Sequence, residues 1–170
     1  MTAYDATVRH AIYVERLKSG LARSISEKVR AIGLDVASVV RDSDLQNLSR
    51  SQLNRLLNRI DRMMVDGYAP AKAEVLDALR DFGIYEAGWA AKSAERAQIV
   101  SALAVPSDAD IWKAVYSRPF QGRLLREWLR ALDASAAERV RRTIRQGYAD
   151  GLGPLEVARQ IKGTRTRPGI

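Results

Sequence analysis

Cysteine is absent from this sequence, and this excludes disulfide bonds and thiolate metal sites. Histidine occurs only once, as His10, so a zinc site lacks its preferred ligands. No apolar run approaches the roughly 20 residues that a membrane span needs, and residues 1–12 contain no apolar segment of a secretory signal. Phosphate loops ending in Gly-Lys-Ser/Thr and Gly-x-Ser-x-Gly turns are also missing. We therefore expect a soluble protein without metal, cofactor or catalytic site, and not an enzyme.

Aromatic residues are scarce as well, at 6% of the chain, although apolar residues make up 46%. Much of the apolar content is Ala and Leu, whereas a β-sandwich would need more β-branched and aromatic residues. Apolar residues recur at steps of three and four, and no segment alternates with a period of two. The sequence therefore predicts an all-α protein.

The first long helix is predicted from the apolar spacing between Tyr4 and Ile32, with Gly33 as its stop. Residues 34–48 read as an irregular connection that holds at most one short helix. We expect the first helix to pack against a second one through two leucine- and isoleucine-rich stripes. These stripes comprise Leu17, Leu21, Ile25, Leu53, Leu57 and Ile60.

The second long helix is predicted to begin after Ser49, whose hydroxyl can accept a hydrogen bond from a free backbone N–H of the first turn. Gly67 and Pro70 punctuate its end, and Pro70 then occupies the first position of a third long helix. Helices of this length with short connections favour an antiparallel bundle or helical hairpin. This prediction covers residues 1–104.

Shorter helices are predicted over residues 105–163, where proline and glycine interrupt the chain more often. Ser107, Ser135 and Pro154 each begin one of them, another lies around Leu124 to Leu132, and Gly163 ends the last. Residues 164–170 read as an extended C-terminal arm. The expected organisation is thus a long-helix region, a basic subdomain of short helices and a tail.

Positive charge is concentrated in the C-terminal third of the chain. Residues 118–170 hold 12 of the 28 basic residues but 5 of the 20 acidic ones, so they carry +7 of the net +8. Such a segment can bind nucleic acid or an acidic protein, although a solvated basic surface would also explain it. The residues predicted to bind DNA phosphates or an acidic partner are Arg139, Arg142, Arg145, Arg159, Lys162, Arg165 and Arg167.

Residues 135–163 also resemble a helix-turn-helix in outline, with Gly151 and Gly153 in the turn. The second helix offers few polar side chains to base edges, so phosphate contact without sequence preference is easier to support. A helical DNA-binding protein is therefore the alternative function. His10 is expected to lie at the surface or to be partly packed, and the carboxylates near Asp77 are expected to be solvated.

Four segments resemble the minor head proteins of tailed bacteriophages, the Mu-like head morphogenesis family. The segment from Thr7 to Gly20 contains an ERLK-G type run typical of their first helix. Segments similar to later parts of these proteins are Leu79–Trp89, Pro119–Leu129 and Ile144–Ile161. An ARTE type run, which opens a compact domain in this family, is not found, so functions of that domain are not implied.

The resemblance implies a virion component that is made in the host cytoplasm and acts at the portal vertex or the inner capsid surface. There it would support head morphogenesis and the packaging or ejection of DNA. Its expected partners are portal or capsid proteins, with packaged DNA bound through non-specific phosphate contacts and self-association left open. The resemblance carries no catalytic residue onto this sequence.

Overall fold

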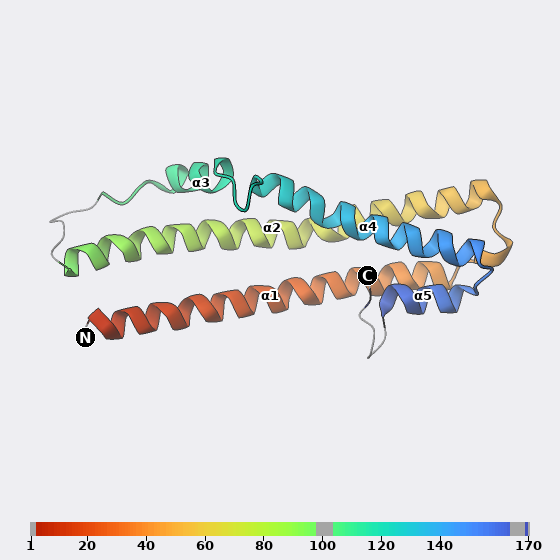
Figure 1. Ribbon diagram of the computed structural model, residues 1–170, viewed down its shortest axis with the longest axis horizontal. Helices are drawn as coiled ribbons and strands as arrows, with labels where there is room; N and C mark the ends of the chain where they lie inside the picture. The colour runs from red at the N-terminus through yellow and green to blue at the C-terminus, as the bar shows by residue number, and fades with distance from the viewer. Residues whose placement is uncertain (1–2, 98–103, 164–168, 170) are drawn as a thin grey trace. The chain divides into compact units, whose positions relative to one another are not determined.

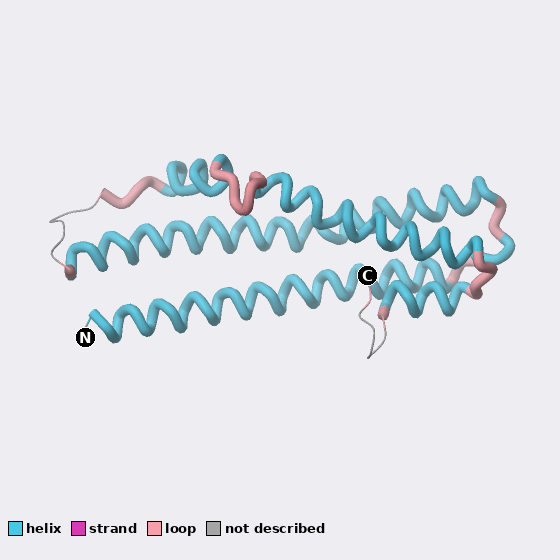
Figure 2. Tube along the Cα trace, viewed as in Figure 1, coloured by secondary structure: helices cyan, strands magenta, loops and turns pink. Residues whose placement is uncertain are grey.

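The computed structural model describes residues 3–97, 104–163 and 169 (Figure 1). Within these residues the chain is helical and contains no strand, only an isolated bridge between Phe120 and Arg123 (Figure 2). The all-α prediction is therefore confirmed. The elements are α1 (Ala3–Arg41), a short 3-10 helix η1 (Leu45–Asn47), α2 (Arg50–Arg96), α3 (Asp108–Ser117), α4 (Leu125–Ala149) and α5 (Pro154–Lys162).

Helix α1 continues through Gly33 to Arg41, so the predicted stop at Gly33 and the predicted irregular connection after it are wrong. The cause is burial, since Ile32, Val36 and Val40 follow one another at steps of four and all lie in the core. A glycine inside a helix costs only about 1 kcal/mol relative to alanine, and burying two valines outweighs that cost.

Helix α2 likewise continues through Gly67 and Pro70, where the sequence predicted one helix to end and another to begin. Pro70 lies inside the helix and is exposed, whereas Tyr68 and Ala71 on either side of it are buried. Proline in a helix interior costs one backbone hydrogen bond. The buried face on both sides of Pro70 keeps the two segments in one helix.

Three of the predicted helix ends are confirmed by their caps. Ser49 Oγ accepts a hydrogen bond from the Gln52 backbone N–H at 3.3 Å, and Gln52 Oε1 accepts one from the Ser49 N–H at 2.7 Å. At α3, Ser107 Oγ accepts from the Asp110 N–H at 3.2 Å. Gly163 ends α5 with a positive φ of 79°, a conformation that glycine adopts without strain.

Helix α4 is a single element, although the sequence predicted one helix up to Leu132 and another from Ser135. The residues between them include Asp133, which is 8% exposed. Ala136, Val140 and Ile144 continue the same buried face at steps of four. Helix α4 therefore continues because its core-facing side is uninterrupted.

The chain forms two compact units that are discontinuous in sequence. Unit 1 comprises Met1–Ser24 and Ala73–Trp128, and unit 2 comprises Ile25–Lys72 and Leu129–Ile170. This division differs from the predicted boundary at residue 104, because α1, α2 and α4 each contribute residues to both units. Of the predicted tail, only Gly169 is among the described residues.

Unit 2 contains the hydrophobic core. Its members come from the last turns of α1, from η1, from the first half of α2 and from α4 and α5. Leu53, Leu57 and Ile60 are buried as predicted, but Leu17 and Leu21 belong to unit 1 and are only partly buried. The short connection after α1 explains the difference, because it places the residues nearest to it in the core. The α1 side chains in this core are Ile32, Val36, Ala37 and Val40.

Unit 1 buries far less. Among its described residues, only Ala91 is less than 9% exposed. Large apolar side chains remain at its surface on α1, α3 and α4 and in the loops beside α3, and these are Tyr4, Val8, Ile12, Tyr13, Val105, Tyr116, Phe120 and Trp128. Partly buried side chains, including aromatic rings in contact between α1 and α2, therefore hold unit 1 together in place of a fully buried core.

Candidate nucleic-acid or acidic-partner interface

Three of the predicted basic residues form an exposed row on α4. Arg139, Arg142 and Arg145 recur every third residue, and all three are exposed. Val140 and Ile144 are buried on the other side of the helix, so packing fixes which way the arginines face. Arg139 Nη1 donates to Ser135 Oγ at 3.2 Å, a contact that leaves its charge uncompensated.

The same arginine influences the buried phenol of Tyr68 on α2. Burial raises the pKa of Tyr68, and the positive charge of Arg139 offsets part of that rise. The pKa rises because the phenolate would lose its hydration inside the core. The arginine row therefore lies next to the core of unit 2.

Arg141 has a different role from its neighbours in this row. Its guanidinium donates to Asp61 on α2, and both side chains are partly buried. A second ion pair joins Lys72 Nζ on α2 to Asp133 Oδ2 on α4 at 2.7 Å. Removing one partner of such a pair would leave an uncompensated charge, so these contacts fix α4 on α2. Neither cation is free to bind a partner.

On α5, Arg159 and Lys162 are both exposed, whereas Val157, Ala158 and Ile161 are buried. No carboxylate of the described residues pairs with either cation. The remaining two predicted residues, Arg165 and Arg167, lie outside the described residues. The structure thus places five of the seven predicted residues, in two groups on neighbouring helices of unit 2.

The turn between α4 and α5 is held by hydrogen bonds to other parts of unit 2. Gln46 Nε2 donates to the Gly151 carbonyl at 2.8 Å, and Tyr148 Oη donates to the Leu48 carbonyl at 2.8 Å. Gly147 also allows close packing, because an added Cβ would collide with the buried side chain of Val157. These contacts fix α5 against α4 and leave its polar side exposed. The exposed polar residues of α5 are Glu156, Arg159, Gln160 and Lys162.

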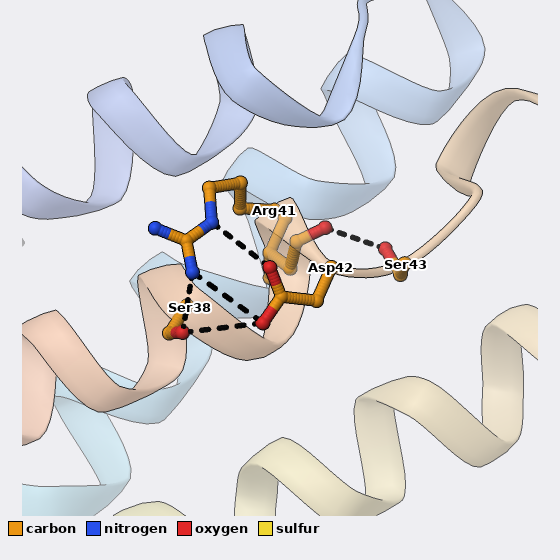
Figure 3. Close-up of polar contacts among 5 residues, drawn as sticks. Ser38, Arg41, Asp42 and Ser43 are labelled. Atoms are coloured by element: carbon orange, nitrogen blue, oxygen red, sulfur yellow. Dashed lines mark hydrogen bonds and ion pairs between the residues drawn. The ribbon is translucent and has the colours of Figure 1, made fainter.

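A further cation, Arg41, was not predicted from the sequence. It ends α1, where its Nε donates to Asp42 Oδ1 at 2.9 Å and its Nη2 donates to Ser38 Oγ at 3.0 Å (Figure 3). Ser38 Oγ in turn donates to Asp42 Oδ2 at 3.3 Å, and Ser43 Oγ donates to the Val40 carbonyl at 2.6 Å (Figure 3). The hydrogen bond from Arg41 holds the pKa of Asp42 below its usual range. The network orients the guanidinium at the end of the helix.

Unit 1 contains a polar cluster around His10 that sequence reasoning also missed. His10 Nε2 lies 3.2 Å from Glu86 Oε1, and its Nδ1 lies 3.3 Å from the Tyr85 hydroxyl. The imidazole stacks on Trp89 with 3.8 Å between ring centroids. Because both ring nitrogens have partners and one ring face is covered, this histidine joins α1 to α2 and has no nitrogen left for a substrate. Of the two expected placements, at the surface or partly packed, His10 takes the second.

Other kinds of site are not found in the described part of the chain. Within residues 3–97, 104–163 and 169 no three or more His, Asp or Glu side chains are grouped so that they could hold a metal ion. No helix there is both long and apolar enough to span a membrane. The chain matches no family model, no curated protein and no solved structure. The exposed cations of unit 2 therefore remain the candidate site.

Proposed function

We propose that this protein is a structural component of a bacteriophage virion, a minor or internal head protein at the portal or the inner capsid surface. The observation that carries the proposal is the exposed row of Arg139, Arg142 and Arg145, which α4 presents from a well-packed unit. The resemblance of four segments to phage minor head proteins supports the same assignment. In this proposal α1 and α2 form an antiparallel hairpin whose exposed apolar side chains contact other virion proteins.

The arginine row suits a partner that offers many negative charges without fixed positions. A guanidinium can donate two parallel hydrogen bonds to a phosphate or a carboxylate, and it stays charged at any relevant pH. Packaged DNA and an acidic portal or capsid surface both meet this requirement. Binding to DNA would then be independent of sequence and strongly dependent on salt.

Replacing the three arginines with glutamine tests this part of the proposal. If DNA is bound through their phosphate contacts, the slope of log affinity against log salt should flatten by up to about three units. The matched control is Arg55→Gln, Arg59→Gln and Arg62→Gln on α2, which removes the same charge from exposed positions. An equal effect of both triple variants would show that only net charge matters and would overturn the assignment to α4.

The virion assignment is tested separately, on particles purified from a culture that produces the protein. Antibodies against the chain should label these particles, and the α4 triple variant should be incorporated less than the α2 triple variant. Absence of the protein from particles that are otherwise complete would refute the virion assignment.

The arrangement of α4, the turn and α5 keeps a DNA-binding protein as the second candidate. The observation that favours this candidate is the polar side of α5, where Glu156, Arg159 and Gln160 are exposed to solvent. A reader of base edges would select one sequence from a random pool. If no DNA sequence is enriched from the pool, this candidate is excluded, whereas non-specific binding to DNA phosphates is not.

A further inference from the structure

Helix α5 lies beside the last turns of α1 within unit 2 and runs in the opposite direction (Figure 1). A shallow groove of about 210 Å³ separates the two helices. Each helix contributes four residues at positions i, i+3, i+4 and i+7. These residues are Leu34, Ala37, Ser38 and Arg41 from α1, and Leu155, Ala158, Arg159 and Lys162 from α5.

Two leucines and two alanines form an apolar strip within the groove. Leu155 is 57% exposed and Leu34 is 39% exposed, and both line the groove. Ala37 and Ala158 between them are small and almost fully buried, so the surface is recessed between the two leucines. An apolar side chain placed on these alanines would cover both leucines and remove their surface from water, which favours binding.

Cations line the same groove. Arg159 and Lys162 lie on the α5 side, and Arg41 lies on the α1 side, held by Ser38 and Asp42 (Figure 3). Because the two helices run in opposite directions, each end of the groove has a leucine from one helix and a cation from the other. A partner that covers the leucines would therefore also need negative charge opposite Arg159 and Lys162, whereas Asp42 already pairs with Arg41.

We propose that this groove binds an acidic amphipathic helix of a partner protein. Two helices whose contributing residues repeat at three and four positions form a groove that accepts a third helix by ordinary ridge packing. Nucleic acid fits less well, because its phosphates would leave Leu34 and Leu155 without an apolar contact. The inference rests on the proposed acidic-partner interface, since Arg159 and Lys162 belong to it, and it specifies the kind of partner.

A synthetic helical peptide provides the probe. It carries leucine at helical spacing on one face and glutamate elsewhere, with a fluorescent label for anisotropy measurements on the full chain. A matched peptide with lysine in place of glutamate and a DNA duplex of random sequence are the comparison ligands. The glutamate peptide should bind and the lysine peptide should not, because only the former complements Arg159 and Lys162.

Leu155→Gln distinguishes the two kinds of partner. It should lower affinity for the glutamate peptide about tenfold while leaving DNA binding unchanged. Val65→Gln is the matched control, since Val65 is 55% exposed on α2 and does not line the groove. Arg159→Gln combined with Lys162→Gln should weaken peptide binding by about tenfold or more. Circular dichroism would verify that each variant is folded.

Two results would overturn the groove proposal. One is the absence of binding to the glutamate peptide, or peptide affinity that Leu155→Gln does not change. The other is loss of DNA binding, without loss of peptide binding, in the variant that lacks Arg159 and Lys162, which would identify nucleic acid as the occupant. Failure of the proposed function would instead be seen in two other experiments, the comparison of the α4 and α2 triple variants and the labelling of purified particles. Neither experiment involves Leu155.

Discussion

Gly67→Ala tests the contact between α1 and α2 in the core of unit 2. A Cβ at residue 67 would lie 2.8 Å from Ile32 Cγ1, 3.2 Å from Cδ1 and 3.3 Å from Cγ2. Ile32 is 7% exposed and belongs to the core, so a methyl group at residue 67 would force its side chain to shift. Gly33 offers a matched control, because a Cβ there would meet nothing within 4 Å and the residue lies inside α1 in the same unit.

Two opposing effects set the expected magnitude. Alanine is favoured over glycine in a helix interior by about 1 kcal/mol. Forcing an additional methyl group into a packed core costs about 1–3 kcal/mol. Gly67→Ala should therefore destabilise the protein by roughly 0–2 kcal/mol, whereas Gly33→Ala should stabilise it by roughly 0.5–1 kcal/mol.

Denaturant unfolding followed by circular dichroism measures both changes. An Ile32→Ala background removes the side chain that the new methyl group would meet, so Gly67→Ala should become stabilising there. If Gly67→Ala stabilises the wild-type protein as much as Gly33→Ala does, the close packing between Gly67 and Ile32 is refuted.

Three further predictions concern unit 2. Leu57→Ala should destabilise by about 2–5 kcal/mol in denaturant unfolding, because Leu57 is fully buried, and a neutral result would contradict the core assignment. Lys72→Met should cost about 2–4 kcal/mol by leaving Asp133 buried without its cation, somewhat less than a fully buried pair because Lys72 is partly exposed. The lowered pKa of Asp42 means that its contribution to stability is present above the unfolded pKa and is lost as the pH falls through the folded one. Arg41→Gln should raise the Asp42 pKa in an NMR titration, and an unchanged value would show that the hydrogen bond is not the cause.

The apolar pattern predicted which faces of the helices are buried, but not where the long helices continue. Leu53, Leu57 and Ile60 are in the core because their spacing places them on one helical face. Gly33 and Pro70 are ordinary local signals for helix ends, yet α1 and α2 pass through them. Burial on both sides of each residue decides the outcome, and a single sequence does not show it.

Only those parts of the candidate site whose side-chain directions follow from the pattern of a single helix could be predicted from the sequence. The outward direction of Arg142 and Arg145 follows from the inward direction of Ile144 beside them. The groove was not predictable, because its α1 side lies in residues 34–48, which the sequence marked as irregular. The ion pair between Arg141 and Asp61 joins residues 80 positions apart, and no local pattern shows such a pairing.

The uneven burial of the two units has a consequence for how the native protein fluctuates. Local opening requires little free energy where few side chains are buried, and hydrogen exchange reports such opening amide by amide. Backbone amides of α1 before Ser24 and of α2 after Ala73 should therefore exchange through frequent partial opening. Amides near Val36 and Ile60 should exchange only when unit 2 opens as a whole. Each long helix thus resists local opening in the part that belongs to unit 2 and opens readily in the part that belongs to unit 1. Unit 1 can therefore adapt to a partner while unit 2 stays folded.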